Sequence, residues 1–235
     1  KYTTLQRSTL IEFLKDKLFT NNFRFGKEVR KVSKIKEKLL INFVDNTNDL
    51  VDFIIVSDGV FSKTKLIIEN KTIKPRYNGS VAIRTVIKLS EEFNYDSKNI
   101  SLIMFPNAHV VIYPINKRND FNLVCIAREK LSQNYDIHSI IKKKIFSKNK
   151  NLENLFKSDL NLWPVYVSKK PIKSIYENVF YLGDAFYTFV PAFAQGASQS
   201  IEAAYELFNL LSDNKKNIQN IYFKKRLKRT NQINK

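Results

Sequence analysis

The order of hydrophobic and polar positions along this chain predicts a mixture of strands and helices. Between positions 29 and 56, short alternating runs predict strands at 29–35, 39–45 and 49–56, the first two joined as a hairpin. Longer alternating runs between positions 77 and 127 are typical of an antiparallel meander with one face on a core. The pattern therefore favours a fold that combines antiparallel sheet with helices.

Apolar residues that recur every three or four positions predict helices at 3–19, 137–155 and 218–232, and another that begins near Ser198. The apolar stripe of the first helix comprises Leu10, Ile11, Leu14 and Leu18. On the helix after Ser198, the same spacing predicts that one face packs inward. That face consists of Ile201, Ala204, Tyr205, Phe208 and Leu211.

The stretch 178–211 is the most informative part of the sequence. Its apolar strand, 179–182, ends in Gly183 and Asp184, and a loop containing Pro191 leads into the helix near Ser198. Free backbone N–H groups at a helix start favour negatively charged ligand groups. A carboxylate that follows a strand can bind ribose-type hydroxyl groups. The stretch therefore predicts a cradle for an anion or a cofactor.

Composition supports a folded chain and excludes several kinds of site. The 235 residues are 43% hydrophobic and 13% aromatic, which argues against disorder. Cys125 is the single cysteine, so neither a disulfide within the chain nor a cysteine-based zinc site is expected, and with two histidines we expect no metal. No apolar run approaches the roughly 20 residues of a spanning helix, and the first residues lack a signal-peptide pattern. We therefore expect a cytoplasmic protein.

The formal net charge of +18 has two interpretations. One is binding to nucleic acid, to an anionic membrane or to an anionic ligand. The other is compositional drift, because lysine, asparagine and isoleucine are abundant throughout the chain. We favour drift, and so expect no specific nucleic-acid partner, while peripheral membrane contact stays open.

The predicted cradle resembles a known motif. Its order and spacing are similar to the second flavin-binding motif of the aromatic-ring FAD monooxygenases, which include salicylate hydroxylase, para-hydroxybenzoate hydroxylase and the ubiquinone-biosynthesis hydroxylases. There the motif runs GDAAH, then P, then QGxxxxIEDA. The matching residues are Gly183, Asp184, Ala185, Pro191, Gln195, Gly196, Ala197, Ile201 and Glu202. The chain departs from the motif at Phe186 and Tyr187, in place of a small residue and histidine, and at Ala203, in place of aspartate.

Other positions are similar to the same family. Asp58 and Gly59 resemble its middle motif, GADGxxSxxR, with Lys65 in place of the final arginine, although Asp-Gly alone also marks an ordinary turn. Arg7 matches an arginine that lies beside the FAD phosphates in the family, and its spacing also suits the edge of a core. Arg84 matches an arginine common at this place, which makes it a candidate for binding an acidic substrate or an outward-pointing strand residue.

The resemblance implies an α/β (mixed α+β) fold. Residues 1–75 and 166–235 would form a discontinuous, Rossmann-like FAD-binding domain, and residues 76–165 an inserted antiparallel β-sheet domain for the substrate. The five glycines form no G-x-G-x-x-G turn. We therefore expect the chain to lack the first βαβ unit of the FAD domain, and to bind FAD poorly and be inactive alone.

The resemblance also implies an activity. NADH or NADPH would reduce FAD, and molecular oxygen would then hydroxylate a small aromatic or quinone-precursor ring through a flavin hydroperoxide. Asp184 would bind the ribityl chain, Pro191 would shape the loop on the flavin face, and the N–H groups of Gly196, Ala197 and Ser198 would stabilise negative charge on the pyrimidine edge. Two alternatives stay open: an FAD-binding relative that does not hydroxylate, and a basic module that binds nucleic acid or membrane. The substrate and the oligomeric state stay open too.

Overall fold

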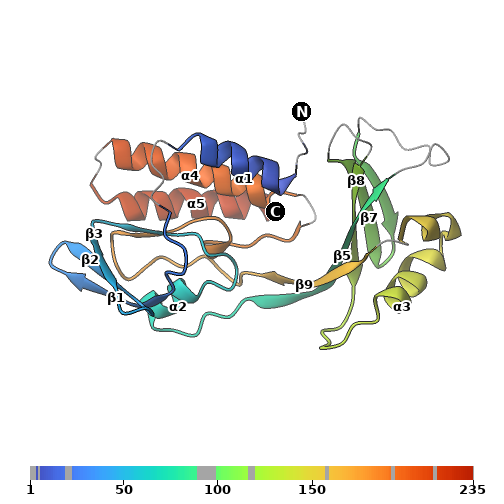
Figure 1. Cartoon of the computed structure of the whole chain (residues 1–235), viewed down its shortest axis with the longest axis horizontal. Coiled ribbons are helices and arrows are strands. Elements are labelled where there is room, and N and C mark those ends of the chain that lie inside the picture. Colours follow the sequence, from blue (N-terminus) through green and yellow to red (C-terminus); the bar gives the residue numbers. More distant parts are fainter. Residues whose placement is uncertain are drawn as a thin grey trace. The chain divides into compact units, whose positions relative to one another are not determined.

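A computed structural model describes residues 4, 6–18, 23–88, 99–115, 120–156, 159–191, 194–213 and 216–234 (Figure 1). The chain forms two compact units. The sheet unit contains Lys1–Asn22 and Gly79–Val165, and the cradle unit contains Phe23–Asn78 and Tyr166–Lys235. The first 22 residues group with the sheet unit, whereas the sequence assigned them to the FAD-binding domain. The division into functional domains stays a prediction.

The sheet unit is built on a five-stranded sheet with the order β6-β7-β8-β5-β9. Its strands pair antiparallel from β6 to β5, so the predicted meander is confirmed. The longest ladder joins β5 to β8, from Ser80 opposite Arg128 to Lys88 opposite Asp120. The strands are β5 (Arg76–Lys88), β6 (Ser101–Phe105), β7 (Ala108–Pro114), β8 (Asp120–Arg128) and β9 (Asn161–Val167).

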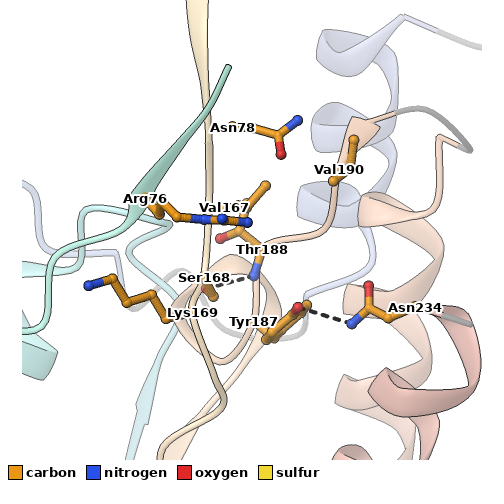
Figure 2. Close-up of a pocket in the computed structure, with 9 residues that line it drawn as sticks. All are labelled: Arg76, Asn78, Val167, Ser168, Lys169, Tyr187, Thr188, Val190 and Asn234. Atoms are coloured by element: carbon orange, nitrogen blue, oxygen red, sulfur yellow. Dashed lines mark hydrogen bonds between the residues drawn. The ribbon is translucent and has the colours of Figure 1, made fainter. Parts of the chain in front are cut away.

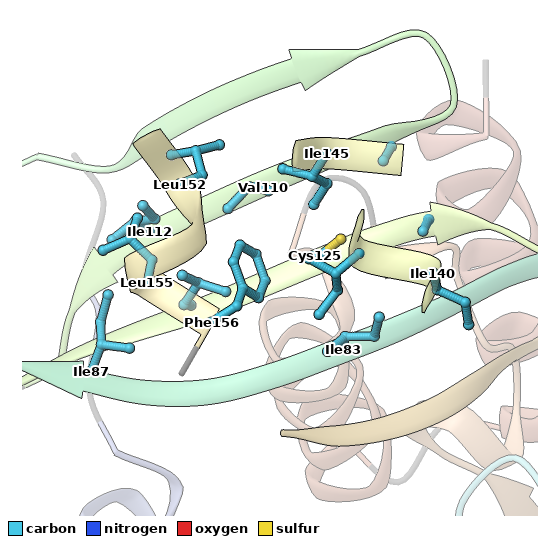
Figure 3. Packing of buried hydrophobic residues seen from close by; sticks show 14 of the residues in the cluster. Ile83, Ile87, Val110, Ile112, Cys125, Ile140, Ile145, Leu152, Leu155 and Phe156 are labelled. Carbon is cyan, nitrogen blue, oxygen red and sulfur yellow. The ribbon is translucent and has the colours of Figure 1, made fainter. Parts of the chain in front are cut away.

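Helical turns cover one face of this sheet (Figure 3). Strand residues Ile83, Val110 and Cys125 are 0% exposed, because alternate positions of their strands point to this core. Ile145 and Phe156 from the turns complete it. The single helix predicted at 137–155 is instead divided into α3 (Ile137–Ile141), the π-helical η1 (Lys142–Phe146) and the 3₁₀-helical η2 (Lys150–Phe156).

Helix α1 (Arg7–Asp16) has no buried residue. Ile11, Leu14 and Leu18 of its predicted apolar stripe are exposed. The prediction that this stripe is buried is therefore wrong for the described chain, and the expected ends of the helix, at Thr3 and Phe19, lie outside the described residues. Among the described helices, none is both long and apolar enough to cross a membrane.

The cradle unit contains a three-stranded antiparallel sheet and a two-stranded parallel sheet. The predicted hairpin is confirmed, with Ile35 opposite Lys38, and the strand predicted at 49–56 is divided into two. The three-stranded sheet comprises β1 (Val29–Ile35), β2 (Lys38–Phe43) and β3 (Asn48–Val51). The other elements are β4 (Ile54–Val56), α2 (Lys63–Glu69), β10 (Val179–Tyr181), the 3₁₀ turn η3 (Gly183–Ala185), α4 (Gly196–Ser212) and α5 (Ile218–Ile233).

The parallel pair β4–β10 positions the candidate site. Val56 lies opposite Tyr181 at the carboxyl end of the pair, and both side chains are buried. Because parallel strands end at the same edge of a sheet, the Asp58–Gly59 turn and the Gly183–Asp184 turn begin beside each other. Segments that are more than a hundred residues apart in sequence are thus brought to one edge.

The buried face of α4 differs from the predicted one. Ile201, Tyr205 and Phe208 are 57%, 69% and 65% exposed, whereas Leu207 and Leu210 are buried and pack on Phe180 and Tyr222. The expected inward face was therefore wrong. The helix bears two apolar stripes, and helical spacing alone does not say which of them faces the strands.

Candidate cofactor cradle

The turn after β10 lies in close contact with the first turn of α4. Gly183 has φ +59°, which L side chains rarely adopt, and a Cβ atom at this position would lie 2.9 Å from Ser200 Oγ. Ser200 Oγ in turn donates to the carbonyl oxygen of Gly196 at 2.9 Å. Glycine at 183 is therefore favoured by the backbone conformation, and a larger residue would also have to displace the Ser200 hydroxyl.

Asp184 extends its carboxylate from this turn towards solvent. The side chain is exposed in the described chain, yet partial burial by the surrounding protein raises its pKa. Its backbone carbonyl accepts a hydrogen bond from Thr188 Oγ1 at 3.0 Å, which fixes the turn. Among the described residues, no side chain hydrogen-bonds or ion-pairs with the carboxylate. It is therefore available to accept hydrogen bonds from a ligand.

The N-terminus of α4 lies next to the same turn. The first backbone bond within the helix runs from Gln199 N to the carbonyl of Gln195, so the N–H groups of Gly196, Ala197 and Ser198 precede the regular ladder. Gln195 forms no side-chain cap on them. A Cβ at Gly196 would meet nothing within 4 Å, which leaves open space over the helix start. This arrangement suits a polar or negatively charged ligand edge.

The Asp58–Gly59 turn caps a second, shorter helix. Asp58 Oδ2 accepts from Thr64 N at 3.1 Å, and Ser62 Oγ accepts from Lys65 N at 3.0 Å. Gly59 has φ +89°, so a side chain there would be strained. In the described structure these residues shape the start of α2, and ligand binding by Asp58 and Gly59 stays a prediction.

Lys65 joins the two turns directly. Its Nζ donates to the carbonyl of Ala185 at 2.6 Å and lies 5.8 Å from the centre of the Tyr181 ring. The side chain is buried, and this burial lowers the pKa of Lys65, while the carboxylates of Asp58 and Glu69 act in the opposite direction. The sequence showed Lys65 only as a departure from a motif, and its contact with the turn after β10 was not foreseen.

Glu69 extends this buried polar cluster. Its carboxylate accepts hydrogen bonds from Tyr181 OH and from Ile175 N, the latter at 3.3 Å. Burial and the neighbouring Glu69 raise the pKa of the Tyr181 phenol. Glu69 lies one helical turn after Lys65, a spacing that could have indicated a shared face of α2.

A second polar cluster, centred on the buried Arg226, joins α4 to α5. Arg226 is 3% exposed and donates to Glu202 Oε1 and to Gln199 Oε1, both at 2.9 Å. Arg229 Nε donates to the same Glu202 oxygen at 3.0 Å. Burial by itself raises the pKa of Glu202, but the hydrogen bond and charge of Arg226 and the charge of Arg229 outweigh it and lower the pKa. The cluster holds the first turns of α4 in place.

The remaining predicted site residues are less constrained. Pro191 lies in the loop between η3 and α4. Arg7 and Arg84 belong to the sheet unit and are exposed, so their roles towards a cofactor or a substrate stay predictions. The guanidinium of Arg84 lies 5.9 Å from the centre of the Trp163 ring.

Known proteins share this fold. No family model matches the chain. The FAD-dependent monooxygenase eupB of Phoma sp is 23% identical over 227 residues, covering 88% of this chain and 51% of eupB. HpxO of Klebsiella pneumoniae, solved with FAD and uric acid, matches with a TM-score of 0.84 and 18% identity, covering 95% of this chain and 59% of HpxO. A salicylate hydroxylase–substrate complex matches with a TM-score of 0.80 and 18% identity, covering 97% and 63%.

These matches confirm the predicted fold, which is the mixed α/β fold of HpxO and salicylate hydroxylase. The chain spans about half the length of the curated relative that it matches. The fold and the cradle geometry together are the premise from which a function can be proposed.

Proposed function

We propose that this chain forms part of an FAD-dependent monooxygenase that hydroxylates a small aromatic or quinone-precursor ring. The observation that carries the proposal is the cradle itself. Gly183 is held against the first turn of α4, so that the Asp184 carboxylate and the free N–H groups of the helix lie at one edge of the parallel pair. The shared fold supports the choice of FAD as the ligand.

Each cradle group has a distinct task in this proposal. Asp184 accepts hydrogen bonds from ribityl hydroxyl groups, and its neighbour Gly183 allows the turn to approach α4 closely. The N–H groups at Gly196, Ala197 and Ser198 donate to the pyrimidine edge of the flavin, where the helix dipole favours negative charge. Bound FAD supplies the redox chemistry with NADH or NADPH and oxygen, and the protein supplies orientation and electrostatics.

The substrate side of the proposal rests on the sheet unit. Arg84 points away from the core that contains Ile83, and Trp163 is half exposed beside it. A guanidinium next to an aromatic ring suits a ligand that combines a flat ring with an acidic group. We propose that an aromatic acid binds to this face in the complete protein, and that the protein acts in the cytoplasm.

The test uses the full-length gene product that contains this chain. We expect the purified protein to show the absorption bands of oxidised flavin and to consume oxygen when NADH or NADPH and a suitable aromatic acid are added. A Gly183→Ala variant should lose flavin, and a Gly26→Ala variant should keep it, because Gly26 has a similar φ of +74° but no atom within 4 Å of its Cβ position.

The outcomes separate the proposal from its alternatives. Flavin binding without any oxygen uptake, tested over a broad panel of aromatic acids, would indicate an FAD-binding relative that does not hydroxylate. A colourless, folded full-length protein would refute the assignment of FAD. If such a protein bound nucleic acid or anionic vesicles with strong salt dependence, a basic binding module would be the better interpretation.

A further inference from the structure

A pocket beside the cradle has a composition suited to phosphate. It is an open pocket of about 500 Å³ within the cradle unit, where the start of β5, the end of β9, the segment after η3 and the end of α5 meet (Figure 2). Small-molecule sites commonly measure about 300–1,000 Å³, so this pocket can hold a substantial part of a cofactor-sized ligand.

The polar groups that line the pocket are hydrogen-bond donors or can act as donors. Arg76 at the start of β5 and Lys169 after β9 contribute two positive charges from different elements, and no carboxylate lines the pocket among the described residues. Arg76 and Lys169 form no ion pair with any described carboxylate. The amide of Asn78 adds further donors. Figure 2 shows Arg76 and Lys169 on one side of the pocket and Asn234 on the other.

Hydrogen bonds connect the wall of the pocket to the cradle. Thr188 N donates to Ser168 Oγ at 3.0 Å, and Thr188 Oγ1 donates to the carbonyl of Asp184 at 3.0 Å. Asn234 Nδ2 donates to Tyr187 OH at 3.0 Å. The hydroxyl hydrogens of Ser168 and Tyr187 remain able to donate to a ligand, because both oxygens act as acceptors in these bonds.

We propose that this pocket binds the pyrophosphate of the nicotinamide dinucleotide that reduces the flavin. The proposal rests on the proposed function, because it requires a flavin in the neighbouring cradle. A pyrophosphate carries negative charge on several oxygens, which suit the planar fork of Arg76, and Lys169 adds a second positive charge at the rim of the pocket. Thr188 links the pocket wall to the backbone of Asp184, so a ligand here lies alongside the flavin-binding turn.

The same chemistry could come from the pyrophosphate of FAD, so the experiment measures both ligands. In the full-length protein with FAD bound, Arg76→Gln and Lys169→Gln are compared with Lys170→Gln, which removes an exposed positive charge next to the pocket but outside its lining. The dissociation constants of NADP⁺ and NAD⁺ are measured by calorimetry at fixed ionic strength, with inorganic pyrophosphate as a competitor. The dissociation constant of FAD is measured on the apoprotein.

We expect Arg76→Gln and Lys169→Gln each to weaken binding of the dinucleotide about tenfold, the usual effect of losing a charge-assisted hydrogen bond. The dissociation constant of FAD should stay close to wild type in both variants. Lys170→Gln should bind the dinucleotide about as tightly as wild type does. Arg76→Lys should recover part of the loss, because it retains the charge but not the planar fork. In the wild type, pyrophosphate should compete with the dinucleotide, and this competition should weaken in both glutamine variants.

Each other result overturns the inference. If the glutamine variants weaken FAD and leave the dinucleotide unchanged, the pocket serves the FAD pyrophosphate. If neither constant changes while flavin is bound and reduced normally, the pocket takes no phosphate, although the proposed function stands. If the wild-type protein binds no flavin at all, the proposed function and this inference fall together.

Discussion

Replacing Gly183 by alanine tests the geometry of the cradle most directly. An alanine would have to keep φ near +59°, and left-handed backbone costs an L residue about 1–2 kcal/mol. Its Cβ would also lie 2.9 Å from Ser200 Oγ, so the serine hydroxyl must turn away and lose its 2.9 Å bond to the Gly196 carbonyl. A lost hydrogen bond of this kind costs about 0.5–1.5 kcal/mol. We therefore expect the free energy of unfolding of the variant to be about 1.5–3.5 kcal/mol lower than that of wild type.

A second background separates the two costs. In Ser200→Ala the hydroxyl is absent, and the remaining Cβ of residue 200 would lie 3.6 Å from the new methyl group, an ordinary contact. There Gly183→Ala should cost only the backbone strain of about 1–2 kcal/mol. The double-mutant cycle compares the free energies of unfolding of wild type, Gly183→Ala, Ser200→Ala and the double variant, each measured by urea unfolding of the full-length protein. Gly26→Ala is the control for backbone strain alone.

The interpretation of the cycle is direct. An equal cost of Gly183→Ala in both backgrounds would show that the turn and α4 are not in close contact. If Gly183→Ala cost nothing in either background, residue 183 would not adopt the left-handed conformation. In Gly183→Ala the affinity for FAD should fall together with the free energy of unfolding, because Gly183 and Gly196 belong to the same cradle.

Three further predictions concern the thiol of Cys125, the amine of Lys65 and the carboxylate of Glu202. Cys125 is fully buried and burial raises the pKa of its thiol to about 12, so it should react with a thiol reagent at pH 8 only after unfolding. Lys65→Met should destabilise the chain by about 2 kcal/mol, read from urea unfolding, because it removes a charge-assisted bond to the Ala185 carbonyl. The pKa of Glu202 is lowered, so its contribution to stability is present above its ordinary pKa of 4.5 and is lost as pH falls through the folded value. In Glu202→Gln, the free energy of unfolding should therefore depend less on pH in this acidic range. An equally steep dependence in the variant would contradict the role assigned to Arg226.

The sequence was sufficient for the antiparallel meander and for the strand before Gly183, but not for the faces of the helices. Strand alternation predicted the meander, because burial on one side of a sheet repeats every second residue. For α4 the spacing of Ile201, Tyr205 and Phe208 was as regular as that of Leu207 and Leu210, and the second set is the buried one. Helical periodicity gives the spacing of a face, whereas the choice between two apolar faces depends on packing partners elsewhere in the chain.

The buried polar clusters were not predictable for a different reason. Lys65 and Ala185 lie 120 positions apart, and their contact follows from the parallel pairing of β4 with β10. Sequence spacing reports only neighbours on one element, so contacts between elements require the topology. The Lys65–Ala185 contact also gives the lysine a structural role, because its ammonium connects α2 to the turn after β10.

Of the departures from the family motif, Phe186 lies on the side of the turn that faces the protein, whereas Tyr187 lines the pocket in Figure 2. Phe186 is buried with its ring 6.2 Å from Tyr222 and 6.0 Å from Phe223, in edge-to-face contacts that fill the space behind η3. Tyr187 accepts its hydrogen bond from Asn234 at the end of α5. An aromatic pair of the kind that Phe186 forms stabilises packing by about 0.5–1.5 kcal/mol beyond the buried area, so Phe186 has a structural role of its own. Gly183, Asp184 and the start of α4 match the motif and form the open part of the cradle, whereas the change at Phe186 is accommodated by packing against α5.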